Sequence, residues 1–485
     1  MNTDALIVPT APRSGLPREL FFLFFVVTGI AAFSASPLIG LLIVGAYLLG
    51  VRLLWQPTES QGLFFALSYQ WMQVFASVAQ SFLDGASISD TLGGEHFEMA
   101  AGLSALGLIF WAIGINLAIA KQASFTTESL AKGLRSIKLK KLTLAWVAVS
   151  IVNVGFSEIG AVLPGVRQAL IAFVIVKWLI VFLLLQRWMF LREGGMVMLL
   201  VFLIELGVGM LGFFSGFKTV FLVSLTAASG VTVLTGKSSK VTGLMWTLMV
   251  FVLVIWQGIK GPYREFLSQG ERSQSVNVSM VERVKWLGTR IAMMDVESMS
   301  EGWKSGLSRL SYIEYFGHSI RFVPAMVPHT NGQLWLEALV HPLTPRMFFP
   351  NKPAIHDSDR TNAFTGQVVA GNDEGTSVSI GYMGESYIDF GKLLMFAPIL
   401  LWGGVVGLGY RVLRRNAPHP ILGSGLACCW IISQVVYLET SNIKLTGGVL
   451  SSFLVLLVLL RCCGQIFWNW LSGEANIAKT EPNSK

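Results

Sequence analysis

The side chains best suited to chemistry lie in a long polar interval, residues 261–390, between two strongly apolar blocks. Its cations stand beside Pro, Gly and aromatic residues rather than on a regular helical face, and the main ones are Arg309, Arg321, Arg346, Lys352 and Arg360. The planar fork of arginine suits phosphate oxygens, and lysine adds a point charge. Each cation alone could form a surface salt bridge, whereas several converging would bind a polyanion such as a diphosphate.

The same interval holds residues that could act as acids or bases. Four of the six histidines fall in it, at His318, His329, His341 and His356. Their spacings match no zinc-binding pattern, so we predict no metal site. Residues 356–360 combine a histidine, two aspartates and an arginine, which could supply a general base, although a solvated polar turn also accounts for them. The sequence contains no P-loop, Rossmann glycine pattern or nucleophile elbow, which leaves nucleotide-driven chemistry without support.

The composition identifies the frame that must position these residues. Hydrophobic residues make up 53% of the 485 residues, charged residues only 13%, and the mean hydropathy is +0.61. Soluble domains carry about 25% charged residues, so the chain is predicted to be a polytopic membrane protein. The formal charge of +8 needs no nucleic acid partner, because cytoplasmic loops of membrane proteins are rich in Lys and Arg. The four cysteines form two adjacent pairs in apolar sequence, typical of core thiols.

A helix needs about 20 apolar residues to cross the hydrocarbon core of a bilayer. On this measure the sequence predicts an all-α fold with about twelve transmembrane helices. The predicted spans are 19–35, 37–55, 62–82, 98–120, 142–157, 166–186, 195–213, 219–235, 242–260, 391–411, 420–438 and 444–462. We therefore divide the chain into a transmembrane bundle (1–260), a large periplasmic loop with amphipathic helices (261–390), and C-terminal spans with a cytoplasmic tail (391–485).

The charges of the short connections predict the orientation. Alternate connections carry most of the Lys and Arg, whereas residues 83–97 carry three acids and no Lys or Arg. The positive-inside rule then places both termini in the cytoplasm and residues 261–390 outside. Apolar residues at three- and four-residue steps from Val284 to Met294 predict an amphipathic helix at the membrane surface or against the bundle. Residues 343–378 are rich in Pro and Gly and are expected to form an irregular loop.

Three further ionisable residues fall in or near the predicted spans. Lys177 and Glu205 lie at similar depth in consecutive spans, and they are expected to face each other or the bundle interior because charges in a membrane usually pair or line a cavity. They would form either a structural pair or an ion path. Lys218, near the outer end of its span, could reach headgroups or an outward-facing cavity.

Several short motifs carry a family resemblance. They are Pro345-Arg346, Phe349-Pro350, Lys352-Pro353, Thr376-Ser377, Gly384-Glu385-x-Tyr387-x-x-Phe390-Gly391, Gly216-Phe217-Lys218, and Arg360 followed by Gly371. In these positions the chain resembles the bacterial O-antigen and exopolysaccharide polymerases (Wzy type), which are related to the O-antigen ligases. The detailed resemblance covers residues 309–391 and the Lys218 region; elsewhere it extends to the number and layout of the spans.

This resemblance implies a GT-C-like, inverting glycosyltransferase in the bacterial inner membrane, without cofactor, metal or nucleotide. Its donor would be a glycan on undecaprenyl diphosphate and its acceptor the next lipid-linked repeat unit, with membrane lipid and a chain-length regulator of the export system as further partners. The implied anion-binding residues are Lys218, Arg309, Arg346, Lys352 and Arg360. Glu385 and His356 are the candidates for orienting or deprotonating the acceptor.

Two other functions remain open from the sequence. An O-antigen ligase would move the same donor onto a different acceptor. A transporter or flippase for lipid-linked oligosaccharides would suit twelve spans and the pair of Lys177 and Glu205, but the long exterior loop and the lack of a visible internal repeat argue against it.

Overall fold

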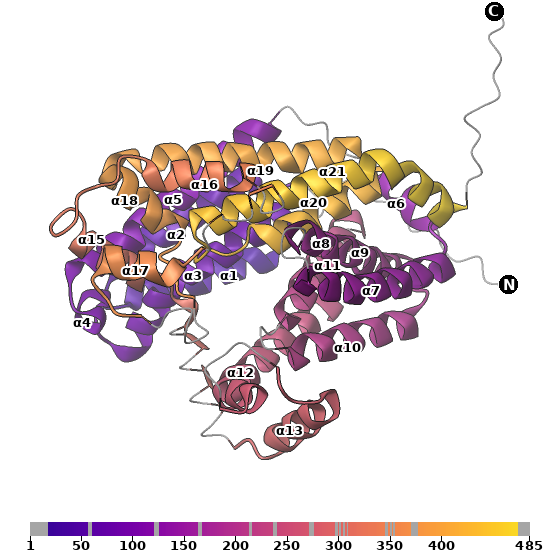
Figure 1. The fold of residues 1–485 in the computed structure, drawn as a ribbon, viewed down its shortest axis with the longest axis horizontal. Coiled ribbons are helices and arrows are strands. Elements are labelled where there is room, and N and C mark those ends of the chain that lie inside the picture. The colour runs from indigo at the N-terminus through magenta and orange to yellow at the C-terminus, as the bar shows by residue number, and fades with distance from the viewer. Residues whose placement is uncertain are drawn as a thin grey trace, which may run out of the picture.

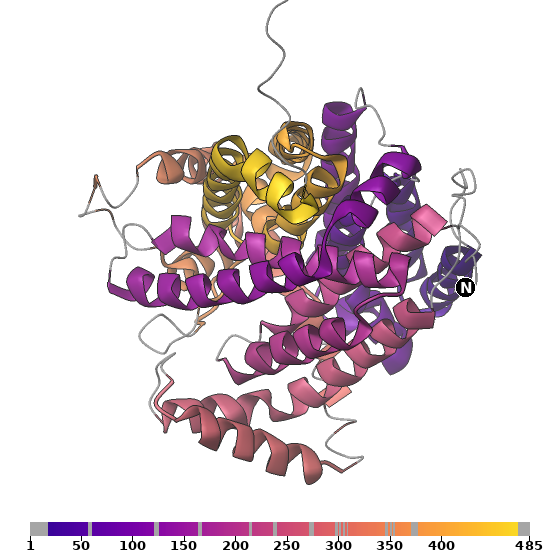
Figure 2. The same cartoon turned by 90° about the vertical axis from the view of Figure 1, so that its right-hand side faces the viewer.

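A computed structural model describes residues 18–56, 61–120, 126–162, 167–212, 216–235, 240–270, 276–295, 299, 302–303, 306–307, 309–344, 348–349, 352, 355–369 and 377–473. Every regular element in these ranges is an α-helix, which confirms the all-α class predicted from the sequence. Figure 1 shows the arrangement of the helices and Figure 2 the same fold from the side.

The helices of the first apolar block are α1 (Arg18–Phe33), α2 (Pro37–Leu54), α3 (Gly62–Asp84), α4 (Ile88–Leu92), α5 (Glu95–Ile119), α6 (Thr127–Ser136), α7 (Leu139–Val162), α8 (Arg167–Ala172), α9 (Val174–Leu191), α10 (Gly195–Leu211), α11 (Phe217–Thr235) and α12 (Lys240–Ser268). They are followed by α13 (Met280–Ala292), α15 (Glu314–Phe322), α16 (Gln333–Leu343), α17 (Asp357–Thr365), α18 (Tyr382–Leu394), α19 (Phe396–Asn416), α20 (Pro420–Gln434) and α21 (Asn442–Ser472).

In the described residues the predicted spans lie mostly on helices, but these helices differ in their capacity to cross a membrane. In the described residues, 7 helices are long and apolar enough to do so: they lie in Pro37–Leu54, Glu95–Ile119, Leu139–Phe156, Ala169–Leu191, Thr242–Ser268, Phe396–Asn416 and Asn442–Ser472. Shorter apolar helices occupy Leu20–Phe33, Gly195–Leu211, Phe217–Thr232 and Pro420–Gln434. These helices indicate a membrane protein, whereas the number of twelve spans stays a prediction.

Helices α5 and α19 pack against each other through glycine. A Cβ added at Gly114 would lie 2.0 Å from the carbonyl oxygen of Leu400, and one at Gly403 would lie 2.2 Å from that of Trp111. Gly407, one turn further along α19, meets Ile115 in the same way at 2.8 Å. Small residues allow membrane helices to pack backbone against backbone. This contact fixes α19, and through it α18, against the N-terminal helices.

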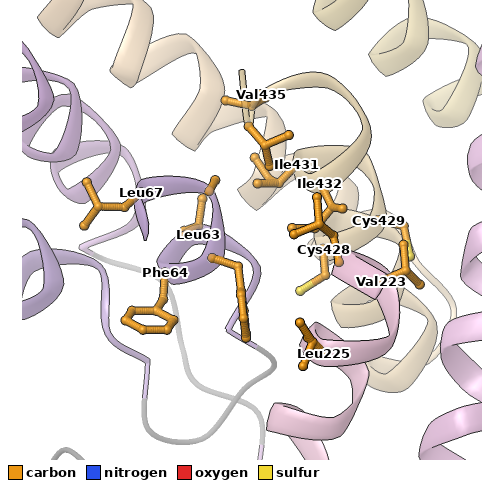
Figure 3. Close-up of a cluster of buried hydrophobic side chains, with 14 of the residues drawn as sticks. Leu63, Phe64, Leu67, Val223, Leu225, Cys428, Cys429, Ile431, Ile432 and Val435 are labelled. Carbon is orange, nitrogen blue, oxygen red and sulfur yellow. The ribbon is translucent and has the colours of Figure 1, made fainter. Parts of the chain in front are cut away.

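A second part of the core joins α3, α11 and α20. Leu63 and Leu67 of α3 meet Val223 of α11 and Ile431 of α20 in a cluster of buried apolar side chains (Figure 3). Cys428 belongs to this cluster and is fully buried. The predicted role as core thiols therefore holds for Cys428 and Cys429. It is wrong for the second pair, Cys462 and Cys463, because both are exposed on α21.

Basic residues gather at one end of the bundle. Arg461 of α21 donates to Asn416 at the end of α19 at 2.9 Å, and Lys141 of α7 donates to the carbonyl oxygen of Trp470 at 2.5 Å. α6 lies at this end, whereas α4, α15 and α17 lie at the opposite end (Figure 1). The fold thus places these basic residues at the end away from α4, α15 and α17.

The polar interval is more helical than its sequence suggests. α12 continues to Ser268, past the end predicted at residue 260, because Tyr263 and Leu267 are buried. The predicted amphipathic helix is confirmed as α13, which begins with a capping box between Ser279 and Glu282. The expectation of an irregular loop at 343–378 is wrong where α17 forms.

The start of α17 also corrects the expectation of a solvated turn at 356–360. Asp357 is 4% exposed and Ser358 is 2% exposed, so this segment is packed against the rest of the protein. The predicted span 391–411 also begins differently. Gly391 has a φ of 70°, which bends the chain where α18 passes into α19.

Candidate functional site

Gln73 of α3 joins three segments that are far apart in the sequence. Its carbonyl oxygen accepts a hydrogen bond from the backbone N–H of Tyr312 at 3.0 Å. Its side-chain oxygen accepts from the backbone N–H of Leu438 at 2.8 Å, and its side-chain nitrogen donates to the Glu439 carboxylate. Gln73 is buried, so these bonds satisfy an amide that would be costly to bury unpaired. The backbone of Gln73 thus holds Tyr312, and its side chain holds Leu438 and Glu439.

Gln70, one turn earlier on α3, supports the same region. Its side-chain nitrogen donates to the carbonyl oxygen of Val435 at 2.6 Å, and its side-chain oxygen accepts from the Tyr382 hydroxyl at 2.8 Å. The connection between α20 and α21, residues 435–441, is thus held by two glutamines of α3. In the sequence these glutamines interrupt an apolar span. In the structure Gln70 bonds to Val435 and Gln73 bonds to Glu439, at the two parts of the same connection.

Four cations lie close to one another, and one of them, Lys218, is within electrostatic range of Glu439. Lys218 lies in the first turn of α11, Lys260 and Arg264 are one turn apart on α12, and Arg309 follows α13 in the chain. The segment before Arg309 lies directly on α12, because a Cβ added at Gly302 would be 2.7 Å from the carbonyl oxygen of Val254. This packing brings Arg309 alongside the end of α12.

The four charges act on one another. Lys260 is within electrostatic range of Arg264, Arg309 and Lys218, and Lys218 is within range of Glu439 and Arg264. Lys218 and Lys260 are half-buried, and neither they nor Arg309 forms an ion pair or a hydrogen bond with another described residue. We call Lys218, Lys260, Arg264 and Arg309 the cation cluster. Like charges held together and partly desolvated are unfavourable, so the cluster is suited to an anionic ligand.

Three tyrosines lie within electrostatic range of Glu439, namely Tyr69, Tyr312 and Tyr437. Burial and then the charge of Glu439 raise the pKa of the Tyr312 phenol. This phenol therefore keeps its proton near neutral pH and can donate a hydrogen bond. The Tyr312 hydroxyl donates to the carbonyl oxygen of Ser379, which ties this wall of the site to the start of α18.

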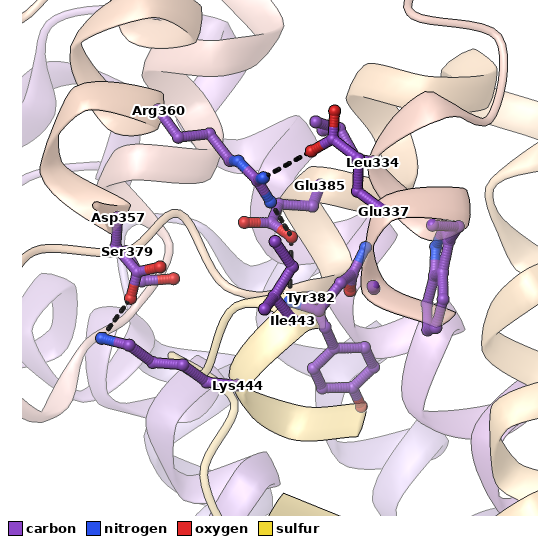
Figure 4. Close-up of polar contacts among 12 residues, drawn as sticks. Leu334, Glu337, Asp357, Arg360, Ser379, Tyr382, Glu385, Ile443 and Lys444 are labelled. Carbon is purple, nitrogen blue, oxygen red and sulfur yellow. Dashed lines mark hydrogen bonds and ion pairs between the residues drawn. The ribbon is translucent and has the colours of Figure 1, made fainter. Parts of the chain in front are cut away.

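A separate ion-pair network locks the helices of the polar interval together (Figure 4). Arg360 of α17 forms ion pairs with Glu337 of α16 at 2.9 Å and with Glu385 of α18 at 3.5 Å. Lys444 of α21 forms an ion pair with Asp357 of α17 at 2.6 Å. Each pair joins α17 to another helix, so this network holds α17 in place.

Glu385 is the most buried carboxylate of this network, with 1% exposure. Its carboxylate accepts a hydrogen bond from the backbone N–H of Asn442 at 2.9 Å. Burial raises the pKa of Glu385 to about 7, although Arg360 and the Asn442 N–H act in the opposite direction. The Glu385 carboxyl group is enclosed between Arg360 and Asn442 and is not accessible to a substrate. We therefore interpret it as a structural residue.

The five predicted anion-binding residues are not all together. Lys218 and Arg309 belong to the cation cluster, whereas Arg360 is engaged by two carboxylates. Lys352 donates to the carbonyl oxygens of His341 and Thr344, which caps the C-terminal end of α16. Arg346 lies outside the described residues. The structure thus places Lys218 and Arg309 in one cationic site, and Lys352 and Arg360 in two structural positions.

The remaining predicted site residues lie elsewhere. His356 is exposed at the N-terminal cap of α17. The Lys177 ammonium lies 2.7 Å from the Glu205 carboxylate, whose other oxygen accepts from the Trp146 indole at 2.9 Å. Because both oxygens of Glu205 are occupied, the geometry is that of a structural pair. In the described residues no three His, Cys, Asp or Glu side chains are placed to hold a metal ion.

An open groove of about 730 Å³ lies between α12 and α13. Its lining includes Glu265, Phe266 and Trp286, and the last two rings are stacked at 5.4 Å. The described residues that line this groove include none of Lys218, Lys260, Arg264 and Arg309. The groove is therefore separate from the cation cluster, although both use α12.

Sequence reasoning missed three functional candidates, Lys260, Arg264 and Glu439. Lys260 and Arg264 are spaced i,i+4, a signal for one helical face, but the predicted span ended at residue 260. Glu439 is a single acid in a short connection, and no motif marks it. Its position follows from the hydrogen bond with Gln73, which no pattern in the sequence reveals.

The fold and the site together define a helical membrane protein with a half-buried cationic site beside its polar interval. The chain belongs to the family of the domain of unknown function DUF8712, which matches residues 102–436. The cation cluster falls within the matched residues, whereas Gln73 and Glu439 fall outside them. No curated protein and no solved structure matches the chain.

Proposed function

We propose that this protein is a glycan polymerase of the bacterial inner membrane. It transfers an oligosaccharide chain from undecaprenyl diphosphate onto the next lipid-linked repeat unit at the outer face of the membrane. The observation that carries this proposal is the cation cluster, in which Lys218, Lys260 and Arg309 gather without an ion-pair partner among the described residues. The motif resemblance to the Wzy-type polymerases supports it independently.

The chemistry of this transfer suits a cationic site. The lipid diphosphate is the leaving group, and its negative charge grows as the bond between the anomeric carbon and oxygen breaks. Cations positioned in advance, in a partly desolvated place, stabilise that charge more effectively than water does. Such a reaction needs no nucleotide, metal or redox cofactor, because the donor already carries its activating group.

The membrane helices supply the other requirement. An undecaprenyl chain stays in the bilayer, so the diphosphate must be bound near the ends of membrane helices. Lys218 begins α11, and Lys260 and Arg264 stand near the end of α12. The N-terminal turn of α11 also contributes the positive end of its dipole. In the orientation predicted from the sequence, these helix ends face the periplasm.

The experiment is chain elongation in proteoliposomes. Purified protein would receive lipid-linked repeat units extracted from producing cells that lack it, and the products would be sized on a gel. We expect the wild type to form a ladder and Lys218→Ala or Lys260→Ala to lower its rate by about 100-fold, the scale typical of a lost charge-stabilising group. Lys285→Ala, which removes an exposed lysine of α13, is the matched control and should keep the wild-type ladder.

Two results would reject the proposal. If the wild type left repeat units unchanged but joined preformed chains to a lipid A core acceptor, the protein would be a ligase. If labelled repeat units crossed the bilayer without lengthening, it would be a transporter. Equal elongation by Lys260→Ala and the wild type would reject the diphosphate role of the cluster.

A further inference from the structure

We infer that Glu439 is the group that accepts the proton of the acceptor hydroxyl in the proposed transfer. This inference rests on the proposed function, and it assigns a catalytic role to a residue in the short connection between α20 and α21. The way Glu439 is held, the groups that surround it and the proton balance of the reaction each support this role.

Glu439 is held at one oxygen and open at the other. Gln73 donates to Oε2, and the described residues provide no hydrogen bond to Oε1. The residue is half-buried, in contrast to Glu385, which is enclosed. Gly381, with a φ of 87°, lies against Leu438 and Glu439 so closely that its missing Cβ would be 2.6 Å from the Leu438 carbonyl oxygen. The start of α18 therefore fixes the backbone of this connection.

The neighbours of Glu439 come from several elements. Lys218 of α11, Tyr69 of α3, Tyr312 before α15 and Tyr437 of the connection itself are within electrostatic range of the carboxylate. Gln73 is neutral. Thus a carboxylate stands at the edge of a cationic site without a close ion pair to any described cation. That arrangement leaves it available as a base, since a carboxylate in a tight salt bridge accepts a proton less readily.

The proton balance is complete with the groups described. The acceptor oxygen forms the new bond to the anomeric carbon of the donor, and its proton passes to the Glu439 carboxylate. The bond from the anomeric carbon to the diphosphate oxygen breaks, and the electron pair leaves with the lipid diphosphate beside the cation cluster. The protonated Glu439 then returns the proton to water, so no further reactant is needed.

The test compares Glu439→Gln and Glu439→Asp with Lys260→Ala in the elongation assay and in a binding assay. The binding probe is undecaprenyl diphosphate in detergent micelles, followed by its effect on the thermal unfolding temperature. We expect Glu439→Gln to bind the probe at least as tightly as the wild type, because a negative charge has been removed from a cationic site. Elongation by this variant should fall by about 100-fold or more, and Glu439→Asp should restore part of it.

The two Glu439 variants separate a base from a structural group, because Glu439→Asp keeps a carboxylate that can accept the proton and Glu439→Gln does not. If Glu439→Gln elongated at the wild-type rate while Lys260→Ala failed, Glu439 would be a counter-ion and the proposed function would stand. If the wild type did not elongate repeat units at all, the proposed function would fail together with this inference.

Discussion

At the scale of single residues, the two carboxylates of greatest interest differ in what encloses them. Glu385 is surrounded by Arg360, the Asn442 N–H and packed backbone, and it is 1% exposed. Glu439 is half-buried and bonded at one oxygen. We therefore assign a structural role to the first and a chemical role to the second, although the sequence motifs favour Glu385.

The structural role of Glu385 predicts a pH dependence of stability. Its pKa is raised to about 7 in the folded protein, whereas a glutamate in an unfolded chain has a pKa of about 4.3. The folded state therefore binds the proton more tightly, and stability falls as pH rises from the lower value through the higher one. A difference of one between the folded and unfolded pKa values corresponds to about 1.4 kcal/mol in the free energy of unfolding.

The measurement is the thermal unfolding temperature of the wild type and Glu385→Gln in detergent at several pH values between about 5 and 8, the window in which the folded-state carboxyl ionises. The wild type should lose stability relative to the variant as pH rises, because glutamine cannot ionise. Parallel curves for the two proteins would show that Glu385 does not titrate in this range. Lys285→Ala should follow the wild type.

At the scale of elements, glycine contacts decide how closely the helices pack. Gly114→Ala would place a methyl group 2.0 Å from the carbonyl oxygen of Leu400, so α5 and α19 must move apart. Overpacking of this kind costs about 1–3 kcal/mol. The control is Gly45→Ala in α2, where an added Cβ meets nothing within 4 Å. A lowered unfolding temperature for Gly114→Ala, with none for Gly45→Ala, is the expected result. Equal temperatures would contradict the described α5–α19 contact.

Apolar segments predict the helices of this chain well, because a run of about 20 apolar residues has few alternatives in a membrane. The same measure fails where polar residues are buried by tertiary contacts. The sequence of α17, Asp357–Thr365, has little apolar periodicity, and the helix is held in place by ion pairs with α16, α18 and α21. α12 likewise extends beyond its apolar part because Tyr263 and Leu267 find packing partners.

The candidate site is predictable from the sequence only in part. Lys218 and Arg309 are among the predicted anion-binding residues, and the structure brings them together. Lys352 and Arg360 are predicted on the same grounds, but hydrogen-bond geometry assigns them to the end of α16 and to α17. Contacts between distant segments decide which cation pairs with a carboxylate and which does not. A single sequence does not record these contacts.

At the scale of the whole molecule, the polar groups are divided between two neighbouring regions. One is an ion-pair network that fixes α16, α17 and α18 against α21. The other is the site in which Gln73 bonds to Tyr312 and Glu439, and Glu439 is within electrostatic range of Lys218 of the cation cluster. Tyr312 connects the two regions, since it bonds to Gln73 and to Ser379 before α18. The ion-pair network therefore helps to hold the site around Gln73 and Glu439 in place.

The most direct test is an experimental structure of the protein with undecaprenyl diphosphate bound in lipid nanodiscs. We expect density for the diphosphate among Lys218, Lys260 and Arg309, within hydrogen-bond distance of at least two of them. Density for the diphosphate at Arg360, at Lys352 or in the groove between α12 and α13, with none at the cation cluster, would contradict the central claim.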